Sequence, residues 1–160
     1  MFDGRSGVAG RLSAEGLSLS GALPVFTQSA ALCYRIKCGA PEILLITTRR
    51  AQRWIIPKGW LINGLSAPET AAREAWEEAG VLGKCGTESL GRFAYVKKRS
   101  NNASALCLVD VFPLYVQQME TRFPEAGKRR RKWYSPEKAS AKVSSPELAA
   151  LLDGFGGHSH

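Results

Sequence analysis

Short runs of apolar and β-branched residues recur along the chain, separated by turn-forming residues, and this pattern is typical of strands. Residues 25–36 form a first apolar run, and residues 42–48, with the sequence EILLITT, form a second. A turn at Gly39-Ala40-Pro41 lies between them, so the two runs predict a hairpin. Further strands are predicted at residues 54–57, 88–98, 105–117 and 132–134.

One segment has the signals of a helix at both of its ends. Ser66 and Glu69 have the spacing of a capping box, and Pro68 is tolerated in a first helical turn. Gly80 is the expected C-terminal stop. The sequence therefore predicts a helix over residues 67–79. The apolar stripe that would pack on a sheet consists of Ala71, Ala75 and Trp76.

Two more short helices are predicted near the end of the chain. Each begins with a Ser-Pro-Glu sequence, at Ser135 and at Ser145, and the second is expected to end near Leu152. Strands combined with separate helices indicate the α+β class, with helices packed on a sheet.

The length of 160 residues fits one domain. Residues 1–22 are rich in Gly and Ser without a sustained period, and they predict a flexible N-terminal arm. The predicted domain covers residues 23–153, and residues 154–160, which end in Gly-His-Ser-His, are expected to form a flexible tail.

Three carboxylates lie close together on the predicted helix of residues 67–79. Successive helical residues turn by roughly 100°, so Glu74, Glu77 and Glu78 fall within about one third of the circumference. Like charges at this distance repel unless a cation lies between them. Hard oxygen ligands suit Mg²⁺ or Mn²⁺, which often serve phosphate chemistry. The alternative interpretation of such a charge run is a solvated helix face.

The formal net charge of +8 indicates polyanionic partners such as nucleotides, polyphosphates, nucleic acid or an acidic membrane surface. The basic residues are grouped along the chain rather than dispersed. The groups are Arg49-Arg50 with Arg53 and Lys58, then Lys97-Lys98-Arg99, then the run from Lys128 to Lys132.

The sequence also bears on the cellular setting. No apolar run approaches the ~20 residues of a membrane span, and the N-terminal segment lacks the apolar core of a signal peptide. The cysteines show no C-x-x-C pairing and no histidine partner at zinc-site spacing. We therefore expect reduced thiols, a cytoplasmic location and no membrane partner. The cysteines are Cys33, Cys38, Cys85 and Cys107.

The stretch from Gly59 to Val81, GWLINGLSAPETAAREAWEEAGV, resembles the Nudix box, G-x5-E-x7-R-E-U-x-E-E-x-G-U, in which U is apolar. The glycine, arginine and last three glutamate positions of the pattern all match in residue type and spacing. The matching residues are Gly59, Arg73, Glu74, Ala75, Glu77, Glu78, Gly80 and Val81. The first glutamate of the pattern falls on Leu65, which is the one departure.

The resemblance implies a Nudix-like α/β/α sandwich, in which a mixed sheet lies between helices and the box forms a loop-helix-loop metal site. It also implies that Mg²⁺ or Mn²⁺ is the cofactor and that Arg73 orients the glutamates of the box. The implied metal ligands are the Gly59 carbonyl with Glu74, Glu77 and Glu78.

The reaction that the resemblance implies is metal-dependent hydrolysis of a phosphoanhydride by attack of water on phosphorus. Glu77, Glu78 and Arg73 are the catalytic candidates within the box. The family places the general base variously, so the base stays open. Besides Glu77 and Glu78, the candidates are Glu120, Glu125 and Glu137.

Two segments outside the box are similar to the diphosphoinositol polyphosphate phosphohydrolase branch of the family. They are TTRRAQRWIIPKGW, which leads into the box, and RRKWY, from Arg130 to Tyr134. This similarity implies a polyanionic substrate, either a diphosphoinositol polyphosphate or a nucleoside-diphosphate-linked compound such as a diadenosine polyphosphate. The predicted substrate-binding residues are Arg49, Arg50, Arg53, Lys58, Lys97, Arg99 and Arg131.

Two other functions stay open. The basic surface would also suit removal of pyrophosphate from RNA 5′ ends, which would make nucleic acid the substrate. Leu65 would also suit a non-catalytic module that binds nucleotides or RNA through a degenerate box. Trp54 and Trp60, which flank the entry to the box, could stack on a base or pack in the core.

Overall fold

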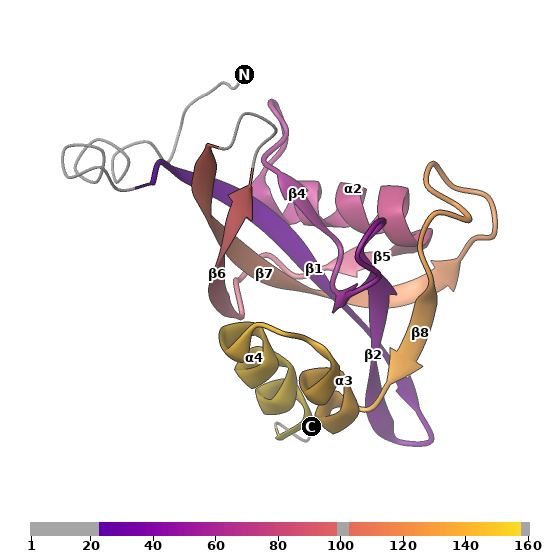
Figure 1. Cartoon of the computed structure of the whole chain (residues 1–160). Helices are drawn as coiled ribbons and strands as arrows, with labels where there is room; N and C mark the ends of the chain where they lie inside the picture. Colours follow the sequence, from indigo (N-terminus) through magenta and orange to yellow (C-terminus); the bar gives the residue numbers. More distant parts are fainter. Residues whose placement is uncertain (1–22, 99–102, 158–160) are drawn as a thin grey trace.

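Two long central strands organise the structure, a computed structural model that describes residues 23–98 and 103–157 (Figure 1). Strand β1 (Val25–Lys37) runs parallel to β7 (Ser104–Met119), in a register that extends from Val25 opposite Leu106 to Tyr34 opposite Tyr115. The remaining strands are β2 (Ala40–Thr47), β3 (Trp54–Ile55), β4 (Lys58–Trp60), β5 (Val81–Cys85), β6 (Gly91–Lys98) and β8 (Arg131–Tyr134), and the helices are α2 (Ala67–Ala79), α3 (Pro136–Lys142) and α4 (Pro146–Gly157).

Within the described residues, the strands form one mixed sheet of eight strands. Its main path has the order β3-β2-β1-β7-β5, while β4 pairs with β1, β6 pairs with β7 and β8 pairs with β2. Among the strands that the structure describes, only β1 and β7 pair in parallel. Because β4 and β8 both join this sheet, segments that lie far apart in the sequence meet near the end of α2.

The strands carry apolar side chains on both faces because both faces of the sheet are covered (Figure 1). One face packs on α2, where Ala71 and Ala75 contact a cluster that includes Leu44 and Ile46. The other face packs on α3 and α4, whose Ala139, Leu148 and Leu152 join a cluster with Leu32 and Leu45. The predicted α+β sandwich with a mixed sheet is therefore confirmed.

Helix α2 begins and ends as its sequence predicts. The Ser66 hydroxyl accepts from the Glu69 amide and the Glu69 carboxylate accepts from the Ser66 amide, which together form the capping box. Gly80 closes the helix in the left-handed conformation with φ 69°. A Cβ atom at this position would lie 2.5 Å from the Phe123 ring, so only glycine fits here.

Four local predictions are corrected. The β1–β2 turn centres on Cys38 and Gly39, both at positive φ, and Ala40-Pro41 already belong to β2. Strand β5 directly follows Gly80 and was not predicted, because its sequence VLGKC is short and mixed. Trp76 is only half-buried and contacts Phe123, while Ala79 takes its place in the core.

The fourth correction concerns α4, which continues beyond Leu152 to Gly157 and so includes part of the predicted tail. The flexibility of that tail stays a prediction, and residues 158–160 and the N-terminal arm, 1–22, lie outside the described residues.

No helix in the described part of the chain is long and apolar enough to cross a membrane. Cys33 and Cys107 are buried in β1 and β7, as their apolar surroundings predict.

Candidate functional site

Strand β4 brings Gly59 against the acidic face of α2. A Cβ atom at Gly59 would lie 2.4 to 2.7 Å from the carboxylate atoms of Glu74, so any larger residue would displace the Glu74 carboxylate from its present position. The neighbouring backbone amide, of Lys58, donates to Oε1 of Glu78 at 3.3 Å. The sheet pairing of β4 with β1, through Gln28 and Ser29 among others, fixes this backbone in place.

Glu74 and Glu78 form a carboxyl pair one helical turn apart. The two side chains are hydrogen-bonded to each other, and Glu78 is only 8% exposed. Burial and the neighbouring Glu78 charge raise the pKa of Glu74 to about 8. Burial also raises the pKa of Glu78, against the opposing effect of Arg129. At neutral pH the metal-free pair therefore holds a proton that a metal ion would displace.

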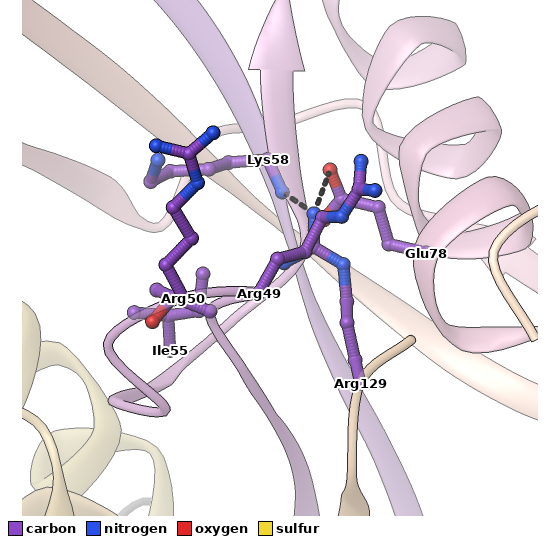
Figure 2. Close-up of a pocket in the computed structure, with 7 residues that line it drawn as sticks. Arg49, Arg50, Ile55, Lys58, Glu78 and Arg129 are labelled. Atoms are coloured by element: carbon purple, nitrogen blue, oxygen red, sulfur yellow. Dashed lines mark hydrogen bonds and ion pairs between the residues drawn. The ribbon is translucent and has the colours of Figure 1, made fainter. Parts of the chain in front are cut away.

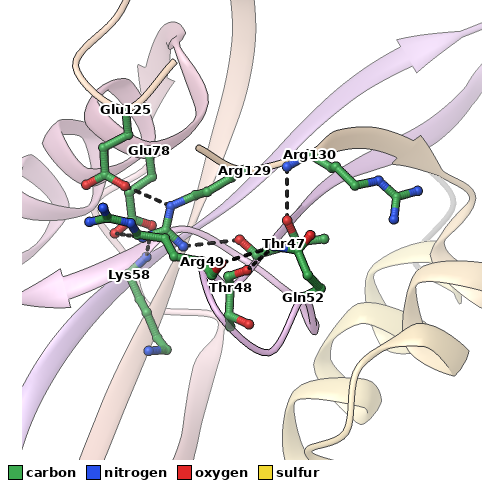
Figure 3. A network of polar contacts seen from close by, with 9 residues as sticks. All are labelled: Thr47, Thr48, Arg49, Gln52, Lys58, Glu78, Glu125, Arg129 and Arg130. Carbon is green, nitrogen blue, oxygen red and sulfur yellow. Dashed lines mark hydrogen bonds and ion pairs between the residues drawn. The ribbon is translucent and has the colours of Figure 1, made fainter. Parts of the chain in front are cut away.

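Arg129 is the cation that reaches this pair from the other side of the site (Figure 3). Its side chain is 11% exposed and lies between two glutamates, with Nη2 3.7 Å from Oε2 of Glu78 and Nε 2.9 Å from Oε1 of Glu125. A third contact runs from Nη1 to the Thr47 carbonyl at 3.2 Å. The amide of Glu125 donates to the Glu77 carbonyl at 3.0 Å, which attaches this loop to α2.

A pocket of about 320 Å³ opens beside Glu78 (Figure 2). Its wall combines this one carboxylate with several cations and the apolar side chain of Ile55, among the described residues. The lining residues are Thr48, Arg49, Arg50, Ile55, Lys58, Glu78 and Arg129. A cationic cavity with a carboxylate at its edge suits a ligand that carries several phosphates and a metal ion.

The turn between β2 and β3 presents two of the pocket arginines. Gln52 adopts φ 57° and its side-chain amide donates to the carbonyls of Thr48 and Arg49, at 3.4 and 3.1 Å. The Thr48 hydroxyl accepts from the Arg53 amide at 3.0 Å. These bonds fix the backbone of the turn (Figure 3), while the Arg49 and Arg50 side chains extend from it (Figure 2).

The predicted substrate-binding residues do not all gather at this pocket. Arg49, Arg50 and Lys58 line it, whereas Arg53 is exposed and not among its lining residues. Lys97 lies at the end of β6, where its charge adds to burial, the main cause, in lowering the pKa of the Lys58 ammonium.

Two further predicted substrate-binding residues have a different setting. Arg131 directs Nη1 at the carbonyls of Ala79 and Glu120, at 2.8 and 3.1 Å, and so ties β8 to the end of α2. Its role in substrate binding stays a prediction. Arg99 lies outside the described residues.

The catalytic candidates of the box also occupy different settings. Arg73 is exposed, and in the described part of the chain its guanidinium makes no hydrogen bond or ion pair, so its orienting role stays a prediction. Glu77 is half-buried beside the pair. Leu65, which replaces the first glutamate of the pattern, is half-buried and donates its amide to the Ile62 carbonyl at 3.0 Å.

The three general-base candidates outside the box lie at different distances from the carboxyl pair. Glu125 is near enough to raise the pKa of Glu74, and it is held by Arg129. The Glu120 carboxylate accepts from the Gln118 amide group. Glu137 is exposed on α3, which covers the opposite face of the sheet. The geometry thus favours Glu125 among these three.

The donor set fits a hard divalent cation in part. No group of three or more Asp, Glu, His or Cys side chains in the described residues is assembled closely enough to hold a metal ion on its own. Mg²⁺, however, takes only one or two carboxylates directly and keeps several waters. Glu74 and Glu78, with the backbone of Gly59 against Glu74, supply such a pair, and the pKa of Glu74 is raised by burial and by the neighbouring Glu78 charge, both of which a bound cation would offset.

The aromatic candidates for base stacking have partners of their own. Trp54 packs edge-on against Tyr134, with ring centroids 5.5 Å apart, and Arg130 lies over its ring at 5.0 Å. Trp60 is 40% exposed and packs edge-on against Phe26 at 5.8 Å. These contacts give Trp54 a packing role, whereas Trp60 lies at the surface next to Gly59.

Arg129, Tyr95 and Gln28 belong to the site but were not predicted. The basic run of residues 128–132 marked a cationic segment, yet nothing in that run distinguishes the buried Arg129 from its exposed neighbour Arg130. Tyr95 and Gln28 carry no motif, and only the pairing of β6 with β7 and of β1 with β4 brings them to Lys58.

The carboxyl pair predicts how the stability of the metal-free protein depends on pH. Because the folded pKa of Glu74 is raised from 4.5 to about 8, the folded state binds more protons than the unfolded state between these values. Stability should therefore fall as the pH rises from 5 to 8.5. In Glu74→Gln the decrease in the free energy of unfolding over this pH range should be smaller by about 2 kcal/mol, after allowing for solvent screening of a partly exposed pair.

Urea unfolding in EDTA across this pH range measures the effect. Saturating Mg²⁺ should raise the stability of the wild type at pH 8.5 and should have a much smaller effect on Glu74→Gln, which lacks one of the two carboxylates. If the unfolding free energies of the wild type and Glu74→Gln changed in parallel with pH in EDTA, the Glu74–Glu78 pair would not hold the extra proton.

Comparison with known proteins identifies relatives of this chain. A family model described as the NUDIX domain matches residues 27–154. Nudix hydrolase 16, mitochondrial, from Arabidopsis thaliana is 33% identical over 118 residues, which cover 71% of this chain and 65% of that protein. Nudix hydrolase 4 from the same plant is 37% identical over 114 residues, covering 71% and 53%. Diphosphoinositol polyphosphate phosphohydrolase 3-alpha from Mus musculus is 31% identical over 114 residues, covering 70% and 65%.

The chain thus spans between about half and two thirds of the length of these curated relatives. Among solved structures, the Ap4A hydrolase of C. elegans superimposes with a TM-score of 0.60 over 83% of this chain and 97% of its own, at 20% identity. A Nudix hydrolase from Nitrosomonas europaea superimposes with a TM-score of 0.61 over 84% and 90%, at 19% identity. At these identities the superpositions show a shared fold.

Proposed function

We propose that this chain, which belongs to the Nudix family, is a pyrophosphohydrolase. It would cleave a phosphoanhydride bond in a highly charged diphosphate compound, with Mg²⁺ or Mn²⁺ as cofactor. The observation that carries the proposal is the Glu74–Glu78 pair at the edge of a cationic pocket. A binding module would gain nothing from two adjacent, largely buried carboxyl groups that cannot both ionise without repulsion, whereas a metal site uses one or two carboxylates as ligands.

Glu74, Glu78 and the Gly59 carbonyl would hold the metal ion, with Glu77 and Glu125 close by. When bound, the ion would neutralise the diphosphate and lower the pKa of a bound water. The Lys58 amide keeps Glu78 oriented, at 3.3 Å from Oε1. Glu125, held by Arg129 at 2.9 Å, is the side chain we propose to accept the proton of the attacking water.

The cations of the pocket support a substrate with several phosphates. Arg49 and Arg50 extend from a turn whose backbone is fixed, and Lys58 and Arg129 lie deeper in the wall. The mouse relative is named for diphosphoinositol polyphosphates, and the nematode enzyme with the same fold is named for Ap4A. We propose a diphosphoinositol polyphosphate or a nucleoside-diphosphate-linked compound as the substrate of this chain.

A substrate panel with the wild-type protein tests this proposal. The panel contains a diphosphoinositol polyphosphate, diadenosine tetraphosphate, a nucleoside triphosphate and RNA with a 5′-triphosphate, each with Mg²⁺, with Mn²⁺ and with EDTA. We expect metal-dependent phosphate or nucleotide release from one of the first two compounds. Turnover of the RNA alone would favour RNA 5′ processing instead. Metal-independent binding without any turnover would indicate a degenerate box.

A further inference from the structure

Lys58 is held at both of its ends within the pocket wall. Its backbone amide donates to Glu78, while its ammonium group donates to the hydroxyl of Tyr95 at 3.0 Å. The same nitrogen lies 4.3 Å from the centroid of the Tyr95 ring, within the range of a cation–π contact. In Figures 2 and 3 the ammonium end points away from the Glu78 carboxylate. Burial lowers the pKa of this ammonium, and the charge of Glu78 opposes that shift.

The hydroxyl of Tyr95 is itself held by a buried side chain. It donates to Oε1 of Gln28 at 2.7 Å, and Gln28 is only 3% exposed on β1. Because the hydroxyl donates its proton to Gln28, its lone pairs are available to the ammonium of Lys58 and to the neighbouring thiol of Cys107. Burial raises the pKa of Tyr95, which keeps the hydroxyl protonated at neutral pH. The Tyr95 hydroxyl thus links the Lys58 ammonium to the buried Gln28.

This arrangement sets Lys58 apart from the arginines of the same pocket. Arg49 and Arg50 are exposed, and within the described residues their guanidinium groups have no hydrogen bond or ion pair. They would have to be ordered when a ligand binds, whereas the Lys58 side chain is already ordered. An ammonium group has three N–H donors, and Tyr95 uses one of them. Two donors remain for phosphate oxygens.

We propose that Tyr95 is a positioning residue that fixes the Lys58 ammonium as a preformed binding point for a second phosphate of the substrate. The proposal rests on the proposed function and deepens it. The phosphorus that is attacked must lie at Glu74 and Glu78, while the ammonium lies at the other end of the Lys58 side chain. A substrate with two linked phosphates can place one phosphorus at the carboxyl pair and a second phosphate at the ammonium, so this contact would favour diphosphates over monophosphates.

Tyr95→Phe tests the proposal, because it removes the hydroxyl and keeps the ring. Tyr115→Phe is the matched control, since Tyr115 is exposed on β7, outside the lining of the pocket, and its ring packs on that of Tyr34. We expect Tyr95→Phe to raise KM for the best panel substrate by about tenfold with kcat within about twofold, the size expected for loss of a hydrogen bond to a charged group. The control should match the wild type.

Two further measurements separate positioning from a structural effect. The first is calorimetric binding of inorganic tripolyphosphate in EDTA, for which Tyr95→Phe should also raise Kd by about tenfold. The second is a double-mutant cycle with Lys58→Met, in which Tyr95→Phe should cause no further loss once the ammonium is gone. An additive loss in that cycle, or wild-type tripolyphosphate affinity in Tyr95→Phe, would overturn the proposal.

The outcome also separates this inference from the proposed function. If no panel compound turns over but tripolyphosphate binding depends on Tyr95 only when Lys58 is present, the positioning role stands and the hydrolase proposal fails. If turnover is normal and Tyr95→Phe has no effect on KM, the hydrolase proposal stands and the positioning role fails.

Discussion

Glu78→Gln should lower kcat by about 10²-fold or more with Mg²⁺. Glu78 is the carboxylate that faces both the pocket and Glu74, and its Oε1 already accepts the amide of Lys58. Glutamine keeps the shape and that hydrogen bond but removes the negative charge that a divalent ion requires. Steady-state hydrolysis of the best panel substrate at saturating metal measures the loss.

Two comparisons make this result specific. Glu88→Gln, at an exposed position on the loop before β6, should leave kcat unchanged. Calorimetric titration with Mn²⁺ should show that Glu78→Gln binds the metal at least tenfold more weakly, as expected when a ligand is lost. If Glu78→Gln retained wild-type kcat and Mn²⁺ affinity, the carboxyl pair would not be the metal site.

Arg129→Met should lower the free energy of unfolding by about 2–3 kcal/mol at pH 8. Arg129 is almost fully buried between Glu78 and Glu125, and its removal leaves two partly buried carboxylates without their cation. It also removes the hydrogen bond to the Thr47 carbonyl. Methionine has a similar stem, so most of the apolar contact is kept. Urea unfolding in EDTA measures the change.

The loss should depend on pH, because Glu78 can take up a proton when its cation is absent. We expect a smaller destabilisation at pH 5.5 than at pH 8. Arg122→Met serves as the matched control, since Arg122 is exposed on the same loop, and it should change stability by no more than about 0.5 kcal/mol. Equal effects of the two substitutions would show that Arg129 is not an essential counter-ion of the pair.

The sequence was sufficient for the parts of the site that are local in the chain. The capping box, the Gly80 stop and the glutamate spacing predict α2 and place Glu74 and Glu78 on one face of it, because an i, i+4 relation follows from helical geometry alone. The α+β class was predictable for a similar reason, since apolar runs of strand length alternate with capped helices. Strand β5 was missed because five mixed residues carry little periodicity.

The other half of the site depends on contacts between distant segments. Arg129 reaches Glu78 because β8 pairs with β2, and Tyr95 reaches Lys58 because β4 and β6 both join the sheet. No local sequence pattern predicts which of these strands pair with each other or in which register. The segment Arg129 to Arg131 illustrates this, since one arginine binds carboxylates, the next lies over Trp54, and the third binds the end of α2.

The parallel pairing of β1 with β7 has a consequence for how the protein folds. Val25 pairs with Leu106, so this central ladder can form only after a very long loop has closed, and closure of long loops slows folding. Gly59 and the α2 glutamates lie close together in the chain and can meet early. Arg129 and Tyr95 can join them only after the long-range ladders have formed. We therefore expect the carboxyl pair to assemble before the surrounding cations reach it. During synthesis, the acidic part of the site would form before the basic part.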